Sequence, residues 1–433
     1  MRSSSHLYAI MILLTAALLS GCDSGGNGDE QTRIRLLNAS PGYTSLDLYA
    51  NDDDDDSDQL RVSAASYDTV SSYARFKSGT YTVKFKRNGV ASTLQTMSGK
   101  QFADDSHHTF VAYGTVGHFG ALQISEGVSD ADSGNTKVQL LNTAEAGALD
   151  VYITESSVSL DDASPTFTNI GAGTASSITT IDSGDYRLRV TGANDTDDLR
   201  LDVPTINFAS KKVVSLILSA TQGGVLVNAL VLPQQGDLTR HANTKARVRG
   251  AVGIGNGTTV TARVGGVSVV SSAAIGVVGN YAQVDAGSAT VSLIIDGSPV
   301  SVANQSLTAG GDYTLLIWSN AGGTQTTLIS DDNRLPTTSG KAKIRVLNGL
   351  SALSVPITMA VDFSPIAEGI ALGEASTYTE VDGGSEYQLD ITNATTAANL
   401  LTRSSVSLQS AGVYTMFMSA NGTAVSGTLR KDR

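Results

Sequence analysis

The sequence has almost no cysteine and too little positive charge for several classes of protein. Its 433 residues include one cysteine, Cys22, and carry a formal net charge of −12. A single cysteine cannot form an internal disulfide, so core packing must hold the fold. An acidic chain lacks the basic footprint of a nucleic-acid-binding protein, and it is not drawn electrostatically to anionic lipid. We therefore expect no nucleic-acid partner.

The apolar segment near the N-terminus is also short. Residues 7–19 are thirteen mostly apolar residues without a charge, and Arg2 precedes them. That length suits the core of a signal peptide and is too short to cross a bilayer. The segment closes with Leu-Ser-Gly-Cys, which resembles a bacterial lipobox. The resemblance implies removal of residues 1–21 by cleavage between Gly21 and Cys22, and lipidation of Cys22.

The lipobox predicts where the protein resides. Two or three acyl chains on Cys22 would hold it to a membrane. Residues 22–31 are polar and glycine-rich, which is typical of a flexible tether. We expect an extracytoplasmic protein, lipid-anchored at the periplasmic face of the inner or outer membrane or at the cell surface. An ordinary secreted protein and an uncleaved helical anchor are the alternatives.

The rest of the chain repeats itself. Glycine is frequent (44 residues) and charged residues are few (16%), which favours short strands joined by turns. Four segments at spacings of about a hundred residues open with alternating basic and apolar residues, as in a half-buried strand. They are Arg33–Asn38, Lys137–Asn142, Lys245–Gly250 and Lys343–Asn348.

Each repeat continues with the same landmarks. A Gly-x-Tyr or related strand start begins at Gly79, Gly184, Gly287 and Gly384. Turn signals such as Asn88-Gly89 and Asp296-Gly297 follow it, which predicts hairpins. The repeat ends in another apolar strand. The predicted domains are residues 32–127, 136–233, 244–330 and 341–430.

Repeats of this size, with short strands and little helical periodicity, predict an all-β protein. We expect four tandem antiparallel β-sandwich domains of the immunoglobulin-like kind after the signal peptide and tether. Tyr313 and Tyr414 precede the last strands of two repeats in a way that is similar to the tyrosine corner of such sandwiches. The lone tryptophan, Trp318, lies in an apolar strand and should pack in a core.

The first repeat resembles a known family. Its opening strand is followed by Asn38-Ala-Ser-Pro41 and then by Leu46-Asp-Leu-Tyr49. This order is similar to the exported bacterial repeats called domain of unknown function 4397. The second repeat fits less well, and the third and fourth fit by position only. The resemblance implies an extracytoplasmic array of β-domains and no activity.

The histidines provide few candidates for a metal site or a catalytic base. The pair His107-His108 could bind a metal or act as a base, but it aligns with Tyr313-Thr314 and Tyr414-Thr415 at the start of a strand. We interpret it as a variant strand start. The chain has no His-Glu-x-x-His or Gly-x-Ser-x-Gly pattern, so the usual zinc-protease and serine-hydrolase signatures are missing.

Aspartates provide the weak candidates for a metal site. Asp52, Asp54, Asp56 and Asp58 could gather a calcium ion, because hard cations prefer clustered oxygens. A solvated, self-repelling loop explains them more simply. Asp47 and Asp150 recur at one strand position, and either a ligand site or a buried carboxylate that accepts turn N–H groups accounts for them.

The sequence therefore favours a protein that makes contacts. We expect a membrane-anchored envelope lipoprotein acting as a non-catalytic structural or interaction module, with a protein or glycan partner and no cofactor. The alternative is a surface adhesin or glycan-binding protein, for which Tyr43, Tyr49 and Tyr73 could form aromatic platforms. A metal-dependent hydrolase around His107, His108 and the aspartate loop is the third hypothesis.

Overall fold

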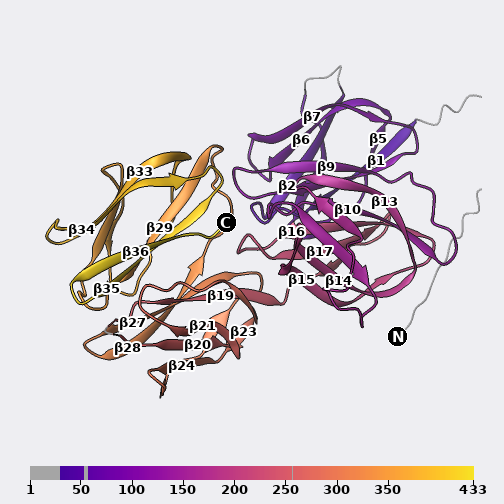
Figure 1. Cartoon of the computed structure of the whole chain (residues 1–433). Coiled ribbons are helices and arrows are strands. Elements are labelled where there is room, and N and C mark those ends of the chain that lie inside the picture. Colours follow the sequence, from indigo (N-terminus) through magenta and orange to yellow (C-terminus); the bar gives the residue numbers. More distant parts are fainter. Residues whose placement is uncertain (1–29, 53–56, 256) are drawn as a thin grey trace, which may run out of the picture.

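The computed structural model describes residues 30–52, 57–255 and 257–433, and these residues fold as four β-sandwiches. We call them units 1 to 4 in chain order. Figure 1 shows them in two pairs, with units 1 and 2 together and units 3 and 4 together. None of the described residues forms a helix that could span a membrane. The predicted all-β fold class is confirmed.

Each sandwich of the first pair consists of two sheets. The strands of unit 1 are β1 (Gln31–Asn38), β2 (Ser45–Asp52), β3 (Leu60–Ser66), β4 (Thr69–Val70), β5 (Ala74–Lys77), β6 (Gly79–Arg87), β7 (Thr93–Phe102), β8 (His107–Tyr113) and β9 (Gly120–Ser125). The strands of unit 2 are β10 (Asn135–Asn142), β11 (Leu149–Thr154), β12 (Phe167–Ile170), β13 (Thr174–Asp182), β14 (Gly184–Gly192), β15 (Asp195–Phe208), β16 (Lys212–Ala220), β17 (Val227–Pro233) and β18 (Thr239–His241).

The second pair repeats this plan, with a further two-stranded sheet in unit 3. The strands of unit 3 are β19 (Lys245–Val252), β20 (Val260–Val264), β21 (Val267–Ala273), β22 (Ala282–Asp285), β23 (Gly287–Ala289), β24 (Val291–Ile295), β25 (Ser298–Val300), β26 (Gln305–Leu307), β27 (Asp312–Asn320) and β28 (Gly323–Asp331). The strands of unit 4 are β29 (Lys341–Gly349), β30 (Ile357–Val361), β31 (Ser364–Ile370), β32 (Thr379–Asp382), β33 (Gly384–Asn393), β34 (Asn399–Leu408), β35 (Val413–Asn421) and β36 (Ala424–Lys431).

One sheet of every unit is built around its first strand. In unit 1 this sheet has the order β4-β1-β8-β9, and the other sheet has the order β3-β2-β6-β7. The first strand runs parallel to the next-to-last strand, as in β1 with β8 and β29 with β35. The neighbouring pairings are antiparallel. The chain can make this parallel pairing because the strands of the other sheet lie between the two in sequence.

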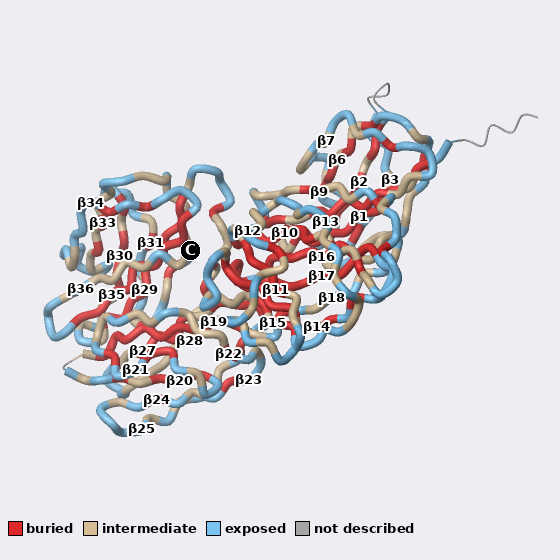
Figure 2. Tube along the Cα trace, turned by 45° about the vertical axis from the view of Figure 1, so that its right-hand side comes forward, coloured by how far each residue is buried: buried red, intermediate tan, exposed pale blue. Residues whose placement is uncertain are grey.

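The first strand of each unit is buried on both faces. In β1, Leu36 packs inside the sandwich of unit 1, whereas Leu37 packs outward against unit 2. Consecutive residues of a strand point to opposite faces, so adjacent buried leucines require cover on both sides. The neighbouring unit supplies the second cover. Figure 2 shows the buried segments continuing from one unit of a pair into the other.

Two apolar clusters join the units into pairs. Leu37 and Val111 of unit 1 meet Ile217 and Leu230 of unit 2. Ala251 and Leu316 of unit 3 meet Leu347 and Phe417 of unit 4, and Trp318 packs against this cluster. Trp318 therefore contributes to the junction between two units and not to the core of one sandwich.

The opening strand of unit 3 lies two residues away from its predicted alignment. Arg249 pairs with Thr314, just as Arg35 pairs with Thr109 in unit 1, so the matching segment is Arg247–Val252 and not Lys245–Gly250. A shift of two residues returns every side chain to the same face of the strand. The alternating pattern is thus unchanged by the shift, and the sequence could not reveal it.

Candidate functional site

A cluster of buried charged side chains lies between units 3 and 4. Arg249 and Arg345 stand at equivalent places in β19 and β29, and their side chains are only 2% exposed. Each arginine donates from Nε to a threonine: Thr314 at 2.9 Å and Thr415 at 3.2 Å. Each also lies over a tyrosine ring, at 4.6 Å from the centroid of Tyr281 and 4.5 Å from that of Tyr378.

The two arginines exchange acidic partners across the junction. Arg249 of unit 3 donates from Nη2 to Asp432 of unit 4 at 3.0 Å. Arg345 of unit 4 donates from Nη2 to Asp331 of unit 3. Both carboxylates are fully buried. We call this reciprocal arrangement of arginine, tyrosine, threonine and aspartate the double lock.

The double lock explains the shifted pKa values of Asp331 and Tyr281. Burial by itself raises the pKa of Asp331, but the guanidiniums of Arg345 and Arg249 outweigh it and hold the pKa below its usual value. Burial raises the pKa of Tyr281 far above its usual value. Shifted pKa values often mark active sites, but these groups are buried and bonded to one another. Their charged groups are already paired with one another, although Asp331, Arg345 and Tyr378 also line hollows of the surface.

Unit 1 contains half of such a lock. Arg35 donates from Nε to Thr109 at 2.8 Å and from Nη2 to Glu126 at 3.1 Å, and it lies 4.6 Å from the ring centroid of Tyr73. It also reaches into unit 2, where Nη1 donates to the Gly236 carbonyl at 2.7 Å. The Gln235 amide of unit 2 donates to Glu126 at 2.6 Å.

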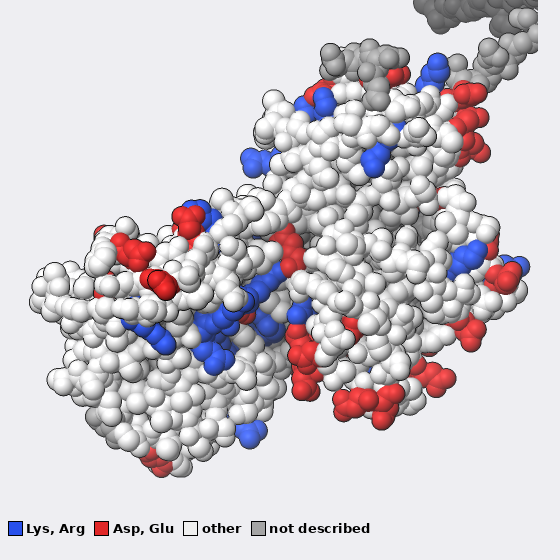
Figure 3. Space-filling view, turned by 45° about the horizontal axis from the view of Figure 1, so that its top comes forward, with Lys and Arg blue, Asp and Glu red and all other residues white. Residues whose placement is uncertain are grey.

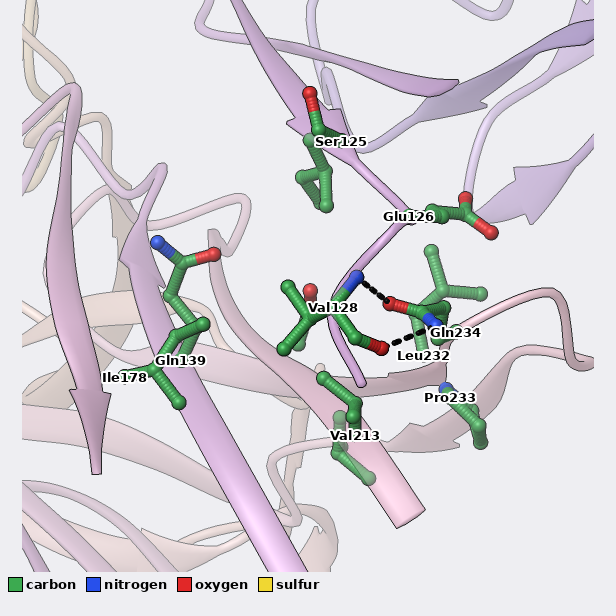
Figure 4. Close-up of a pocket in the computed structure, with 12 residues that line it drawn as sticks. Ser125, Glu126, Val128, Gln139, Ile178, Val213, Leu232, Pro233 and Gln234 are labelled. Atoms are coloured by element: carbon green, nitrogen blue, oxygen red, sulfur yellow. Dashed lines mark hydrogen bonds between the residues drawn. The ribbon is translucent and has the colours of Figure 1, made fainter. Parts of the chain in front are cut away.

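Unit 2 has replaced all members of the set together. The positions equivalent to Arg35, Tyr73, Thr109 and Glu126 hold Gln139, Ile178, Ser215 and Gln234. These residues line a cavity of about 20 Å³ between units 1 and 2 (Figure 4). That volume holds about one water molecule, so the cavity is too small for an organic ligand. In Figure 4, Gln234 spans it to the backbone of Val128.

The histidine pair lies at a strand start, as predicted. β8 begins at His107, and His108 takes the register position of Tyr313 and Tyr414. The His108 ring is buried against Phe102, and its nitrogens contact Ser106 at 3.0 Å and Gln123 at 3.2 Å. Burial lowers the pKa of His108.

Tyr313 and Tyr414 make the bond expected of a tyrosine corner. The Tyr313 hydroxyl accepts from the Thr308 amide at 3.0 Å. The Tyr414 hydroxyl accepts from the Gln409 amide at 2.9 Å. Each bond ties the start of a strand to the backbone five residues upstream.

Part of the aspartate loop can be placed. Asp58 is paired with Lys84 at 2.9 Å and with Lys86. These lysines hold the pKa of Asp58 well below its usual range. Asp54 and Asp56 lie outside the described residues, as do Gly21 and Cys22. Within residues 30–52, 57–255 and 257–433, no three His, Cys, Asp or Glu side chains form a group that could hold a metal ion.

The recurring aspartates are structural. Asp47 accepts from the Ala64 amide at 2.8 Å, and Asp150 accepts from the Asn169 amide at 2.6 Å. Ala64 and Asn169 both have positive φ, which places each at an irregular point of the adjoining strand. Of the two interpretations of these aspartates, the carboxylate that accepts turn N–H groups is therefore correct.

The asparagine that closes the opening motif has a similar role. Asn38 donates from Nδ2 to the carbonyls of Tyr43 and Ala65, at 3.0 and 3.1 Å. Asn142 and Asn348 make the equivalent bonds in units 2 and 4. The side chain is fully buried in all three units. Unit 3 has Val252 at this position.

The proposed aromatic platforms are not open surfaces. Tyr43 is 7% exposed and packs edge-on against Phe119, so its prediction as an exposed platform is wrong. Tyr49 carries the Lys86 ammonium over its ring at 4.8 Å. Tyr73 carries Arg35, and its hydroxyl donates to Glu126 at 2.6 Å. A cation of unit 1 therefore covers one face of the Tyr49 ring and one face of the Tyr73 ring.

An open concave surface lies where unit 1 meets the segment that joins units 3 and 4. A hollow of about 250 Å³, which we call the linker groove, is lined by Thr115, Val116, Asp332, Arg334, Leu335, Thr337, Lys343, Tyr378 and Glu380. It shares Asp332 and Tyr378 with a second hollow of about 460 Å³ between units 3 and 4. No pattern in the sequence predicts this groove, because its residues come from stretches that lie far apart in the chain.

Close packing of backbone fixes the groove. The His118 ring contacts the Pro336 carbonyl, and a Cβ atom on Gly117 would collide with the backbone of Thr337. Glu380 accepts from the Thr337 hydroxyl at 2.7 Å. Figure 3 shows lysine and arginine side chains gathered in the hollow between the two pairs.

The comparisons with known proteins give a family. The sequence model described as "Domain of unknown function (DUF4397)" matches residues 32–152 and 246–355. The chain belongs to the DUF4397 family. Each match covers one unit and the opening of the next, so each runs across the junction within a pair. No curated protein matches the chain.

Several solved structures match the chain weakly. The CBM26-family module CBMbc of Eubacterium rectale Amy13K, solved with maltoheptaose, is 9% identical, with 49% of this chain and 96% of that one covered and a TM-score of 0.15. A Bacteroides uniformis protein proposed to act in cell adhesion is 14% identical, with coverages of 46% and 98% and a TM-score of 0.19. These likenesses do not extend to function.

Proposed function

We propose that this DUF4397 protein is a non-catalytic, adhesin-like binding protein of the bacterial envelope, anchored through Cys22, and that it binds a glycan in the linker groove. The observation that carries the proposal is the contrast between its charged clusters. The arginines and acids of the double lock and the half lock are buried and paired with one another between units, whereas the linker groove is open and lined by polar side chains.

The shape of the groove favours a glycan over a protein partner. A stable protein partner needs roughly 800 Å² of surface on each side. The linker groove is a concavity of about 250 Å³, with a further 460 Å³ beside it. Ligand sites of small molecules have volumes of this order. Hydroxyl, carboxylate, ammonium and guanidinium groups line its walls and can bond to sugar hydroxyls.

A blocking substitution tests the site. Val116 lies at the groove and is 54% exposed, so Val116→Trp should fill the groove without disturbing a core. On a glycan array, we expect the purified full chain to bind a defined set of glycans and the variant to lose them. Ile294→Trp, at a residue 36% exposed in unit 3, is the matched control and should bind normally. Equal binding by both variants contradicts the assignment of the site.

The anchor requires a separate test. In a bacterial host, the wild-type protein should partition with membranes and carry acyl chains detectable by mass spectrometry. Cys22→Ser should release it into a soluble fraction or leave its signal peptide uncleaved. A wild-type protein that is fully soluble and unacylated would overturn the anchor.

A further inference from the structure

The linker groove contains two cations in an acidic protein. The chain has a formal net charge of −12, yet Figure 3 shows lysine and arginine side chains clustered between the two pairs. Arg334 and Lys343 line the groove itself, together with the carboxylates of Asp332 and Glu380. An anionic ligand can therefore bind there only through donors that these carboxylates leave unused.

The groove cations keep unused hydrogen-bond donors. Arg334 bonds to Asp332 through Nε at 2.7 Å and Nη2 at 3.1 Å. In the part of the chain that the structure describes, its Nη1 has no hydrogen-bond acceptor. Lys343 has three donors on Nζ, and Asp332, at 3.2 Å, takes one of them. Its ammonium also lies 4.8 Å from the ring centroid of Tyr378.

The carboxylates of the groove are already engaged. Asp332 is shared by Arg334 and Lys343. Glu380 accepts from the amide and the hydroxyl of Thr337. Burial lowers the pKa of Lys343 in spite of its partner Asp332. The hydrogen-bonding groups left for a ligand are therefore the donors of Arg334 and Lys343.

We propose that the linker groove takes an acidic glycan, whose carboxylate or phosphate group is bound by Arg334 Nη1 and Lys343 Nζ. The inference rests on the proposed glycan-binding function and names the class of glycan. The backbone contacts of Gly117 and His118 with the linker hold the groove in place before the ligand arrives, which reduces the ordering cost of binding.

The test compares charged and neutral ligands on the full chain. The array carries uronic-acid, sialylated and phosphorylated oligosaccharides beside their neutral counterparts. We expect the acidic forms to bind, and Arg334→Gln to weaken them roughly tenfold, as for loss of one charge-assisted hydrogen bond. Arg403→Gln, at an exposed arginine of unit 4, is the control and should change nothing.

The outcomes separate the two proposals. If neutral and acidic glycans bind equally and Arg334→Gln binds both normally, the acidic class is wrong and the glycan function stands. If no glycan binds but inorganic phosphate raises the Tm in an Arg334-dependent way, the glycan function is wrong and the anion site stands. If neither ligand binds, both proposals are overturned. Val116→Glu places a negative charge at the groove and leaves Arg334 unchanged. It should weaken the binding of acidic glycans and leave the binding of neutral glycans as it is.

Discussion

Each pair of units forms a buried junction between two sandwiches, but the two junctions contain different numbers of buried charges. Units 3 and 4 bury two arginines and two aspartates that exchange partners across the junction. Units 1 and 2 bury one arginine and one glutamate, and apolar residues contribute more of that junction. The charges in unit 2 are absent together, since Gln139 and Gln234 replace both members. Removing one member alone leaves a buried charge without a partner, which is costly, whereas removing both costs little.

The largest expected effect comes from breaking the double lock. Asp331→Asn removes the carboxylate that faces Arg345 and leaves a buried guanidinium without an acid. We expect a loss of about 3–5 kcal/mol in the stability of this pair. Trp318, the one tryptophan of the chain, packs at this junction, so its fluorescence during denaturation reports the transition. A loss below about 1 kcal/mol would show that the buried ion pair contributes little to the free energy of unfolding.

The same variant predicts a pH dependence. The pKa of Asp331 is held below its usual value of 3.8, so its contribution to stability is fully present above pH 3.8 and falls away as the pH drops through the folded pKa. The stability difference between wild type and Asp331→Asn should therefore be constant near neutral pH and narrow only in acid. A difference that narrows between pH 5 and 8 contradicts this assignment.

A smaller effect is expected in the half lock, where the replacement found in unit 2 can be copied. Glu126→Gln should cost about 3 kcal/mol because Arg35 loses its one buried acid. The double variant Arg35→Gln with Glu126→Gln should cost less than the single variant. Hydrogen exchange at the amides of β1 and β8 measures both. Asp105→Asn, at an exposed partner of Arg33, should change nothing.

The buried asparagine distinguishes three units from the fourth. Asn348→Val leaves the carbonyls of Val355 and Ile370 without their donor, and we expect a loss of about 2 kcal/mol. The opposite exchange, Val252→Asn, buries an amide in an apolar core and should also destabilise. Thermal denaturation followed by Trp318 fluorescence tests both. A neutral result for both exchanges would mean that the loops, and not this side chain, set the geometry.

The smallest effect on stability concerns the contact between the two pairs. Gly117→Ala should cost about 1 kcal/mol for its positive φ and should also push the unit 1 loop away from Thr337. Gly89→Ala is the matched control, since Gly89 has a similar φ and open space around its Cα. Small-angle X-ray scattering should show a larger radius of gyration for Gly117→Ala alone. Equal radii would show that the linker holds the pairs without this contact.

The fold class was predictable because its signals are local. Alternation, Asn-Gly turns and the tyrosines at the start of the next-to-last strands each act within a few residues, and the structure shows this at Tyr313 and Tyr414. The buried roles of Asp47 and Asp150 could be weighed but not decided from the sequence. The recurrence of an arginine at Arg35 and Arg345 was visible, but its tyrosine and acid come from distant parts of the chain.

The sequence alone determined that this chain forms repeated sandwiches, because the period of two in a strand and the chemistry of a turn are properties of neighbouring residues. Tertiary structure decided how the sandwiches meet. Adjacent leucines at 36 and 37 indicate that both faces are covered, but only the folded chain shows that the cover is the next unit. The linker groove likewise exists only once residues over two hundred positions apart, such as His118 and Pro336, are brought into contact.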